Sequence, residues 1–417
     1  MTPNASPDIR NEPREALAAR FAEWGQPAYR LEQLLGWLYA RRAASWDEMS
    51  NLPRSLREQL AAAWSMGLPA LVRVQGAGDT TRKFLWRLTD GSLVESVLIP
   101  ANPAIDGDRS DRHTLCISTQ VGCAYGCRFC ASGLDGWKRN LLPHEITGQV
   151  LAVERWNTSR PPGERIEGER LINNVVVMGM GEPMANYANL MTALRTLNAP
   201  WGGNIGARKI TLSTSGVVPR IRDLADDPLQ FRLAISLHGA TDEVRNRIMP
   251  VNRKHPVAEL TAACEYYVER KGKMITLEYI LIAGVNDDRA QVAPLAALAR
   301  RLHAKVNLIP YNAVEGLEWR RTPDRECQAF AEALRGAGVT ATLRLEKGHD
   351  IDAACGQLRL KTERELAPDA PAGETPADLE SGTTASPAVR TETAAALEPA
   401  GGTGVPSQPV AERDCAV

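Results

Sequence analysis

The sequence predicts an α/β protein in which a full or partial (βα) barrel follows a small helical domain and precedes a disordered tail. Helical periodicity dominates up to about residue 80, and short apolar segments alternate with amphipathic ones from about Phe84 to Arg364. From Leu366 the composition turns to Ala, Pro, Thr, Glu, Gly and Ser. We therefore expect a helical domain over residues 1–80, a barrel core over 81–365 and a disordered acidic tail over 366–417.

The helical domain is predicted from apolar residues three or four positions apart, such as Leu17 and Phe21. Two helices are expected over Pro13–Trp24 and Arg30–Arg42, and a third begins near Pro53, which suits a first helical turn. Tryptophans supply the bulk of a small core. The arginines between them fit either a solvated face or contacts to RNA; they are Arg30, Arg41, Arg42, Arg54 and Arg57.

The barrel core is predicted from short apolar strands separated by helical crossovers, a pattern that favours a parallel sheet covered by helices. The expected strands are Leu93–Ile99, Thr114–Ser118, Asn174–Met178, Ile210–Thr214, Arg232–Leu237, Ile275–Ile282, Lys305–Ile309 and Thr340–Leu345. The expected helices are Pro143–Trp156, Tyr187–Leu197, Val257–Arg270, Arg289–Leu302 and Glu326–Gly336. In such a barrel the chemistry is expected at the carboxyl ends of the strands.

Composition excludes several classes of protein. The chain is 44% hydrophobic and 24% charged, which is typical of a soluble globular protein. No apolar run approaches about eighteen residues, so no membrane span is expected, and the absence of an export signal predicts a cytoplasmic protein. The net charge is −1, but residues 366–417 carry −6, so the remainder carries +5. A mildly basic body is compatible with a polyanionic partner without establishing one.

The strongest chemical signal is a group of three cysteines, Cys123, Cys127 and Cys130, spaced Cys-x3-Cys-x2-Cys. They follow the strand expected at Thr114–Ser118, so we expect them in the loop at its carboxyl end. Clustered cysteines in a reducing compartment favour metal binding over disulfides. Three thiolates can hold three irons of a [4Fe-4S] cluster and leave the fourth iron open. The alternative is a zinc site completed by a distant ligand.

With Phe129 directly before its last cysteine, this motif resembles the signature of the radical S-adenosylmethionine (SAM) superfamily. The resemblance implies one [4Fe-4S] cluster whose open iron binds SAM and releases a 5′-deoxyadenosyl radical from it. It also implies a full or partial (βα) barrel, which agrees with the alternation of strands and helices.

Polar residues at the ends of later strands resemble the SAM-binding positions of the same superfamily. The resemblance implies that SAM is positioned by Gly181, Glu182, Ser213, Ser236, Leu237, His238 and Asn312. From the residues alone, the Gly-rich turn at Met178–Pro183 is also compatible with a tight βα turn, and His238 with a core histidine.

A C-terminal motif narrows the resemblance. The stretch Asp350–Leu358, which contains Cys355, resembles the family of RlmN and Cfr, which methylates adenine carbons in ribosomal RNA. Two earlier segments match as well: one carries Glu95 and the other Cys116. Taken alone, Glu95 fits better as an exposed strand carboxylate, and the two cysteines as small buried side chains. The sequence Lys138–Leu141 and the residues around Cys355 favour the RlmN branch.

The resemblance implies a route for methylating carbon-2 of adenine, which is not nucleophilic. One SAM methylates the Cys355 thiolate, and a radical derived from a second SAM activates that methyl group for addition to the base. Glu95 acts as proton acceptor, and Cys116 attacks the Cys355 sulfur to release the product through a disulfide. The implied partners are 23S rRNA, tRNA and an outside electron donor of the flavodoxin or ferredoxin type. A monomer without a membrane partner is expected.

Three alternatives remain at this point. The first is a Cfr-type enzyme that methylates carbon-8 of adenine. The second is a radical SAM enzyme acting on a small molecule or peptide, with Cys355 as ligand of an auxiliary cluster. The third is a zinc-bearing RNA-binding module without catalytic activity.

Overall fold

The computed structural model describes residues 6–76, 81–101, 112–134, 136–166, 170–344 and 357–366. Two units are distinguished, Met1–Pro368 and Asp369–Val417, and the second lies outside the described residues. The predicted tail and Cys355 also fall outside them, apart from Leu366.

Three helices form the N-terminal part: α1 (Arg14–Glu23), α2 (Ala28–Leu35) and α3 (Arg54–Ala63). The helix expected over Arg30–Arg42 is two pieces, because α2 passes into a wider π turn at Gly36–Ala40. A buried apolar cluster joins these helices and includes Leu151 of a helix in the core. The Arg155 guanidinium also lies 2.8 Å from Glu48, so the helical part is fixed to that helix by packing and by charge.

Ten strands form one sheet in the order β1-β2-β3-β4-β7-β8-β9-β10-β11-β12. Their bounds are β1 Ala70–Gly76, β2 Arg82–Arg87, β3 Leu93–Pro100, β4 His113–Cys116, β7 Asn174–Val177, β8 Ile210–Thr214, β9 Arg232–Ser236, β10 Thr276–Leu281, β11 Lys305–Pro310 and β12 Ala341–Leu343. From β4 to β12 the pairs are parallel. Within the described residues no ladder joins β12 to β1, so the barrel is partial rather than full.

The pairing of the first strands is antiparallel and differs from the predicted parallel sheet. β1, β2, β3 and β4 pair antiparallel in succession. Helical structure does not extend to residue 80, because Ala70–Gly76 is the edge strand of the sheet. The strands that were predicted match within a few residues, whereas β1 and β2 were not predicted.

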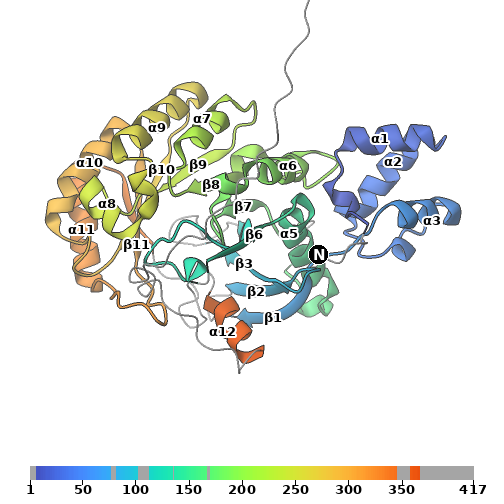
Figure 1. The fold of residues 1–417 in the computed structure, drawn as a ribbon, viewed down its shortest axis with the longest axis horizontal. Coiled ribbons are helices and arrows are strands. Elements are labelled where there is room, and N and C mark those ends of the chain that lie inside the picture. Colours follow the sequence, from blue (N-terminus) through green and yellow to red (C-terminus); the bar gives the residue numbers. More distant parts are fainter. Residues whose placement is uncertain are drawn as a thin grey trace, which may run out of the picture. The chain divides into compact units, whose positions relative to one another are not determined.

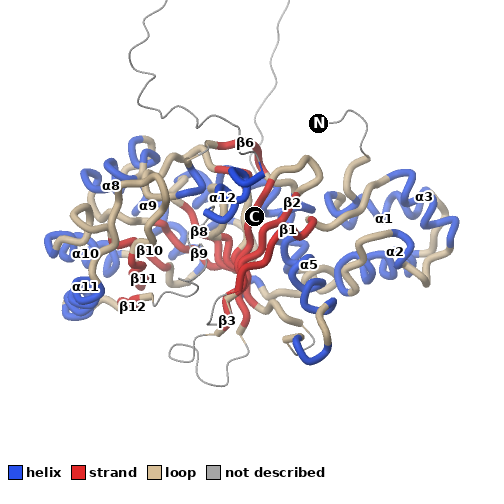
Figure 2. Tube along the Cα trace, turned by 90° about the horizontal axis from the view of Figure 1, so that it is seen from below, coloured by secondary structure: helices blue, strands red, loops and turns tan. Residues whose placement is uncertain are grey.

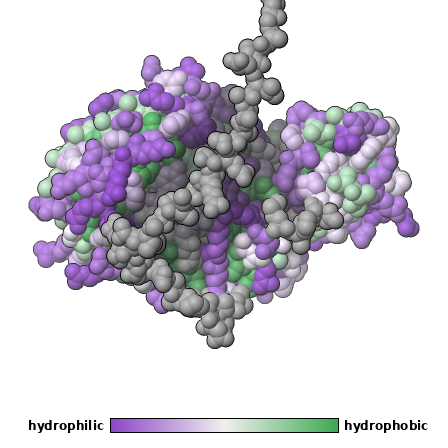
Figure 3. All heavy atoms as spheres, viewed as in Figure 1, coloured by the Kyte–Doolittle hydropathy of each residue, from purple (hydrophilic) through white to green (hydrophobic). Residues whose placement is uncertain are grey.

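The crossover helices lie outside the strands. They are α5 (Pro143–Ser159), α6 (Tyr187–Asn198), α7 (Val218–Asp226), α8 (Asp242–Ile248), α9 (Val257–Lys271), α10 (Val292–Arg301) and α11 (Asp324–Gly336). Figures 1 and 2 show the strands gathered centrally, with α8–α11 on one side and α1–α3 on the other. Hydrophilic residues cover much of the visible outer surface of these helices (Figure 3), as expected of helices whose apolar side faces a sheet.

Two further elements contact strand β3 of the sheet. A small antiparallel hairpin is formed by β5 (Gln120–Gly122) and β6 (Trp137–Asn140). Helix α12 (Gln357–Leu366) buries Leu358 against Leu85 and Leu93 and Leu360 beside Ala131. In the described part of the chain, no helix is long and apolar enough to cross a membrane.

Candidate active site at the carboxyl ends of the strands

The three cysteines lie in the loop between β5 and β6, at the carboxyl end of β4 as predicted. The Cys123 amide donates to the Gly136 carbonyl at 2.9 Å, and the Cys130 amide donates to the Cys127 carbonyl at 3.1 Å. Gly122 has a φ of +74°, and a Cβ there would lie 1.9 Å from the Gly136 oxygen, so only glycine allows the strands to approach this closely. The hairpin therefore holds both ends of the cysteine loop together.

The environment of the thiols favours a cationic ligand. Desolvation raises the pKa of Cys123 to about 12, and it also raises the pKa of Cys127 and of Cys130. The neighbouring Cys130 and Cys123 raise the pKa of Cys127 further. Such thiols become thiolates only when a metal group compensates their charge.

Among the described residues, no group of three or more His, Cys, Asp or Glu side chains is placed to hold a metal ion. The thiols themselves suit an iron–sulfur cluster, because each thiolate of a [4Fe-4S] cluster binds a different iron. Cys123, Cys127 and Cys130 therefore have the chemistry and the common loop that such a cluster requires.

The loop after β7 packs against the chain that leads to the cysteines. Gly181 has a φ of +99°, and a Cβ there would lie 2.5 Å from the Gln120 Cβ. The Glu182 amide donates to Gln120 Oε1 at 2.8 Å. The absence of a side chain at Gly181 thus lets this turn pack closely against the protein's own β5 strand. Its role toward SAM remains a prediction.

The Glu182 carboxylate is buried and accepts three hydrogen bonds within the protein. Its donors are the Met184 amide at 3.0 Å, the Thr214 hydroxyl at 2.8 Å and the Ser215 amide at 2.8 Å. Burial raises the pKa of Glu182, while these donors act in the opposite direction. Glu182 therefore ties the end of β8 to the loop after β7, and three of its about four acceptor sites are in use.

The other predicted SAM-positioning residues lie at neighbouring strand ends. The Ser213 and Ser236 hydroxyl oxygens are 3.2 Å apart across β8 and β9. His238 has a φ of +54°, and its Nδ1 accepts from the Ile280 amide at 3.1 Å, which leaves the proton on Nε2. Burial lowers the pKa of His238 to about 3, so the ring is neutral at physiological pH. Asn312 follows β11.

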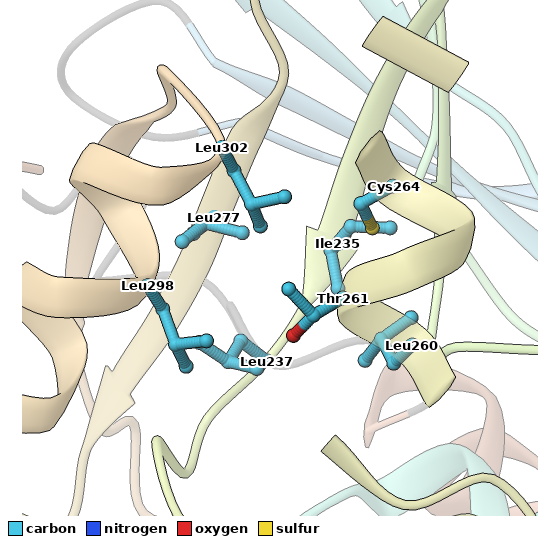
Figure 4. A pocket seen from close by; sticks show the side chains of 8 residues that line it. All are labelled: Ile235, Leu237, Leu260, Thr261, Cys264, Leu277, Leu298 and Leu302. Carbon is cyan, nitrogen blue, oxygen red and sulfur yellow. The ribbon is translucent and has the colours of Figure 1, made fainter. Parts of the chain in front are cut away.

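Leu237 differs from its neighbours because its side chain points away from the strand ends. It lines an apolar cavity of about 10 Å³ between the sheet and helices α9 and α10 (Figure 4). The other lining residues are Ile235, Leu260, Thr261, Cys264, Leu277, Leu298 and Leu302. Only the backbone of Leu237 is therefore placed to contact a cofactor at the strand ends.

The inner face of the antiparallel strands carries Glu95 and Cys116. Cys116 pairs with Val97 in the ladder between β3 and β4, two residues beyond Glu95 on the same face. Glu95 is 3% exposed, so it is not the exposed carboxylate that the sequence alone allowed. Its Oε2 lies 3.0 Å from the Lys83 ammonium. Burial raises the pKa of Cys116 to about 11.

Helix α12 is attached to this same carboxylate. The Arg359 amide, in the first turn of α12, donates to Glu95 Oε1 at 2.6 Å. Two exposed ion pairs add to the attachment: Arg73 with Glu365 at 2.7 Å and Lys138 with Glu363 at 3.4 Å. The chain directly after the Cys355 segment is thus fixed to Glu95, to β1 and to the cysteine hairpin.

Comparisons with known proteins agree with this geometry. The model of the Radical SAM superfamily matches residues 117–293, which include the cysteine loop and the strand ends from β7 to β10. The model of the ribosomal RNA large subunit methyltransferase N-terminal domain matches residues 8–65, which are the helical part.

Similar proteins cover more than four fifths of this chain. A probable dual-specificity RNA methyltransferase RlmN 3 of Opitutus terrae is 54% identical over 361 residues, or 87% of this chain and 96% of the relative. The probable RlmN of Akkermansia muciniphila is 51% identical over 86% of this chain and 97% of its own length. This chain belongs to the RlmN family. It is a radical SAM RNA methyltransferase that uses a [4Fe-4S] cluster and SAM.

A solved structure supports the fold of this family member. The crystal structure of a radical SAM methyltransferase from Sphaerobacter thermophilus aligns with a TM-score of 0.77 and 41% identity, covering 84% of this chain and 98% of the other. Membership in a family of RNA methyltransferases contradicts both the zinc-bearing binding module and the enzyme acting on small molecules or peptides.

Three buried polar residues of the enzyme were not singled out from its sequence. Lys83 is 1% exposed and pairs with Glu95. Glu278 is buried in β10 and accepts from the Asn307 amide group at 2.7 Å, while burial raises its pKa. Arg245 of α8 is fully buried. The available signal was a charged residue directly beside an apolar run, as at Lys83 before Phe84–Trp86.

A wider cavity of about 410 Å³ opens beside the cysteine loop. It is lined by Tyr125, Asn140, Met184, Ala185, Asn186, Tyr187, Ala188, Asn189, Val217 and Arg220. Amide, phenol and guanidinium groups of this kind are suited to contact an unstacked RNA base.

Proposed function

We propose that this enzyme methylates carbon-2 of adenosine in 23S rRNA, at the peptidyl transferase centre, and in the anticodon loop of tRNA. Cys355 would carry the methyl group, Glu95 would accept the ring proton and Cys116 would release the product. Two relatives bear the name of dual-specificity RNA methyltransferases, which supports a second RNA substrate. The carbon-2 assignment rests on the greater resemblance to RlmN than to Cfr.

The observation that carries the proposal is the hydrogen bond from the Arg359 amide to Glu95 at 2.6 Å. Cys355 lies outside the described residues, but it stands four residues before Arg359 in the sequence. Four residues of chain span at most about 14 Å. This short connection supports a role for Cys355 near the proposed base and near Cys116, which lies in the adjacent strand of the sheet.

The proposed cofactor residues divide into two groups. Cys123, Cys127 and Cys130 would hold the cluster, and Gly181, Glu182, Ser213, Ser236, Leu237, His238 and Asn312 would position SAM. The bound cofactors supply a 5′-deoxyadenosyl radical. Because Glu182 and Gly181 already serve the loop packing, we expect their influence on SAM to act mainly through the position of their backbone.

The protein residues then act in sequence. Glu95, whose negative charge is balanced by Lys83 before the reaction, accepts the proton from the substituted ring carbon. The Cys116 thiolate attacks the Cys355 sulfur, a disulfide forms, and the carbon–sulfur bond breaks with its electron pair going to the methylene carbon, which takes up a proton. An outside reductant restores both thiols. An electron donor of the flavodoxin or ferredoxin type would serve the cluster, and we expect a cytoplasmic monomer.

Part of the RNA contact is proposed for the helical part. The Arg41 guanidinium lies 4.2 Å from the Trp37 ring centroid, and that of Arg30 lies 4.9 Å from the exposed Tyr29 ring. Not every arginine there is available: Arg42 pairs with Glu154 at 3.1 Å and Arg54 with Glu58 at 2.7 Å. Arginine–aromatic pairs can stack on unpaired bases.

The test compares three cysteine variants of the full chain. Cys355→Ala should lose RNA methylation while it retains the cluster and SAM cleavage, and Cys116→Ala should accumulate protein covalently linked to RNA. Cys264→Ala is the matched control, because Cys264 is a buried cysteine of the apolar core to which no catalytic role is assigned. Methylation of RNA by Cys355→Ala would refute the methyl-carrier role. Mass mapping of the modified adenosine distinguishes carbon-2 from carbon-8.

A further inference from the structure

Arg245 is a buried cation without a carboxylate partner among the described residues. Its Nη2 donates to the Ser215 carbonyl, and its Nη1 lies 3.5 Å from the Leu237 carbonyl and 3.9 Å from the Met249 sulfur. Its Nε has no hydrogen-bond partner. A buried guanidinium costs several kcal/mol unless an anion compensates its charge. The position of Arg245 therefore requires a negative group nearby.

The cysteine loop is the neighbour that can supply this charge. Ile248, Met249 and Val251, which directly follow Arg245 in the chain, pack against Tyr125, Cys127 and Phe129. The Arg128 amide donates to the Ile248 carbonyl at 3.0 Å. Among the ionisable groups that act on the Arg245 charge, Cys127 of this loop has the largest favourable effect, followed by Asp242, Cys264 and Glu182.

The packing also fixes the guanidinium in place. A Cβ at Gly216 would lie 3.1 Å from Arg245 Nη2, and a Cβ at Gly239 would lie 2.9 Å from the Arg245 amide nitrogen. The ends of β8 and β9 thus close around Arg245 with glycine where a larger residue would intrude. A side chain held this tightly presents a fixed positive charge to the loop.

We propose that Arg245 is the counter-cation of the iron–sulfur cluster and makes that cluster easier to reduce. Reduction adds one negative charge to the cluster, so a nearby fixed cation stabilises the reduced form more than the oxidised form. Net charge and hydrogen bonding are the protein's means of setting such potentials. The inference rests on the proposed cluster ligands, Cys123, Cys127 and Cys130.

The test measures the midpoint potential of the cluster in the reconstituted full chain, without RNA, by paramagnetic resonance during a redox titration. Arg245→Met and Arg245→Gln remove the charge, and Gln keeps a donor for the Ser215 carbonyl if the Met variant fails to hold a cluster. Arg245→Lys retains the charge. Arg247→Met is the matched control, because Arg247 is an exposed arginine of the same helix.

We expect the neutral variants to lower the equilibrium constant for reduction about tenfold, or about 59 mV for one electron. Arg245→Lys and the control should stay within about twofold of the wild type. Equal potentials in all variants would overturn the inference. A shift seen only when SAM is bound would also overturn it, because the partner would then be the SAM carboxylate. Absence of a cluster in the wild type, or its retention by Cys127→Ala, would instead refute the ligand assignment.

Discussion

The buried ion pair between Lys83 and Glu95 offers a direct test of the inner face of the sheet. Their charged atoms are 3.0 Å apart, and the side chains are 1% and 4% exposed. We consider Lys83→Met, which preserves most of the side-chain volume and removes the ammonium. The buried Glu95 carboxylate then loses the ammonium group 3.0 Å away, and the variant should be destabilised.

The magnitude follows from what remains around Glu95. Removing one partner of a buried ion pair costs roughly 3–5 kcal/mol, because the other charge is left uncompensated. The Arg359 amide still donates to the carboxylate at 2.6 Å. We therefore expect a loss near the lower end, about 3 kcal/mol.

The assay is urea unfolding of the full chain, with Lys254→Met as the control, because Lys254 is an exposed lysine. The control should differ from the wild type by no more than about 0.5 kcal/mol. The double variant Lys83→Met/Glu95→Gln should regain at least about 1 kcal/mol over Lys83→Met, since no charge is then left to bury. If Lys83→Met retains wild-type stability, the reasoning is wrong. It is also wrong if the losses of stability measured for Lys83→Met and for Glu95→Gln alone simply add in the double variant.

Three further outcomes are expected. Gly181→Ala should lower the free energy of unfolding by about 2 kcal/mol or more, because the φ of Gly181 is +99° and the new Cβ would overlap Gln120. Gly284→Ala is the control: Gly284 has a φ of +70° but open space around it, so the free energy of unfolding should fall less in the same urea assay. His144→Gln should reduce the loss of stability between pH 7.5 and pH 5. Burial lowers the pKa of His144 in the folded state. The contribution of neutral His144 to stability is therefore complete above the unfolded pKa of 6.5 and is lost as the pH falls, by at most about 1.4 kcal/mol per pH unit. Equal slopes of stability against pH for the variant and the wild type would contradict this role of His144. Ser236→Ala should raise the KM for SAM about tenfold without changing the unfolding midpoint, because it removes one hydroxyl at the proposed SAM position; an unchanged KM would remove Ser236 from that position.

The parallel part of the sheet was predictable because each strand is short, apolar and followed by a helical segment. β8 was predicted with its observed bounds, Ile210–Thr214. β2 was missed for a physical reason: its apolar run is only Phe84–Trp86, preceded by Arg82 and Lys83, and the buried Lys83 is paired with Glu95 of the neighbouring strand. β1 is an edge strand of intermediate exposure, so its alternation is weak.

Helix α8 was missed for a related reason. Its seven residues, Asp242–Ile248, include four charged ones and read as a polar loop. The Thr241 hydroxyl accepts from the Val244 amide and so caps the helix, but this signal is short. Nothing in the local pattern indicates that Arg245, rather than an apolar residue, is the side chain buried in the core.

The cysteine loop could be predicted from spacing alone, because the chemistry of three thiolates is local in sequence. The function of Gly181 and Glu182 could not be read in the same way. Their close contacts are with Gln120 and with Thr214 and Ser215, which come from other strands. A motif that resembles a ligand-binding turn can therefore serve first to hold two strand ends together.

The two faces of the sheet explain why the buried charges gather where the chemistry is expected. On β2 and β3, Phe84, Trp86 and Leu98 point toward the apolar core, and alternation places Lys83 and Glu95 on the opposite, inner face. Charges on that face remain buried only if each finds a partner. Lys83 has Glu95, and Glu278 accepts from Asn307. The hydrogen bonds of Arg245 among the described residues go only to carbonyls and a thioether, so an anionic cluster beside it would compensate its charge more fully.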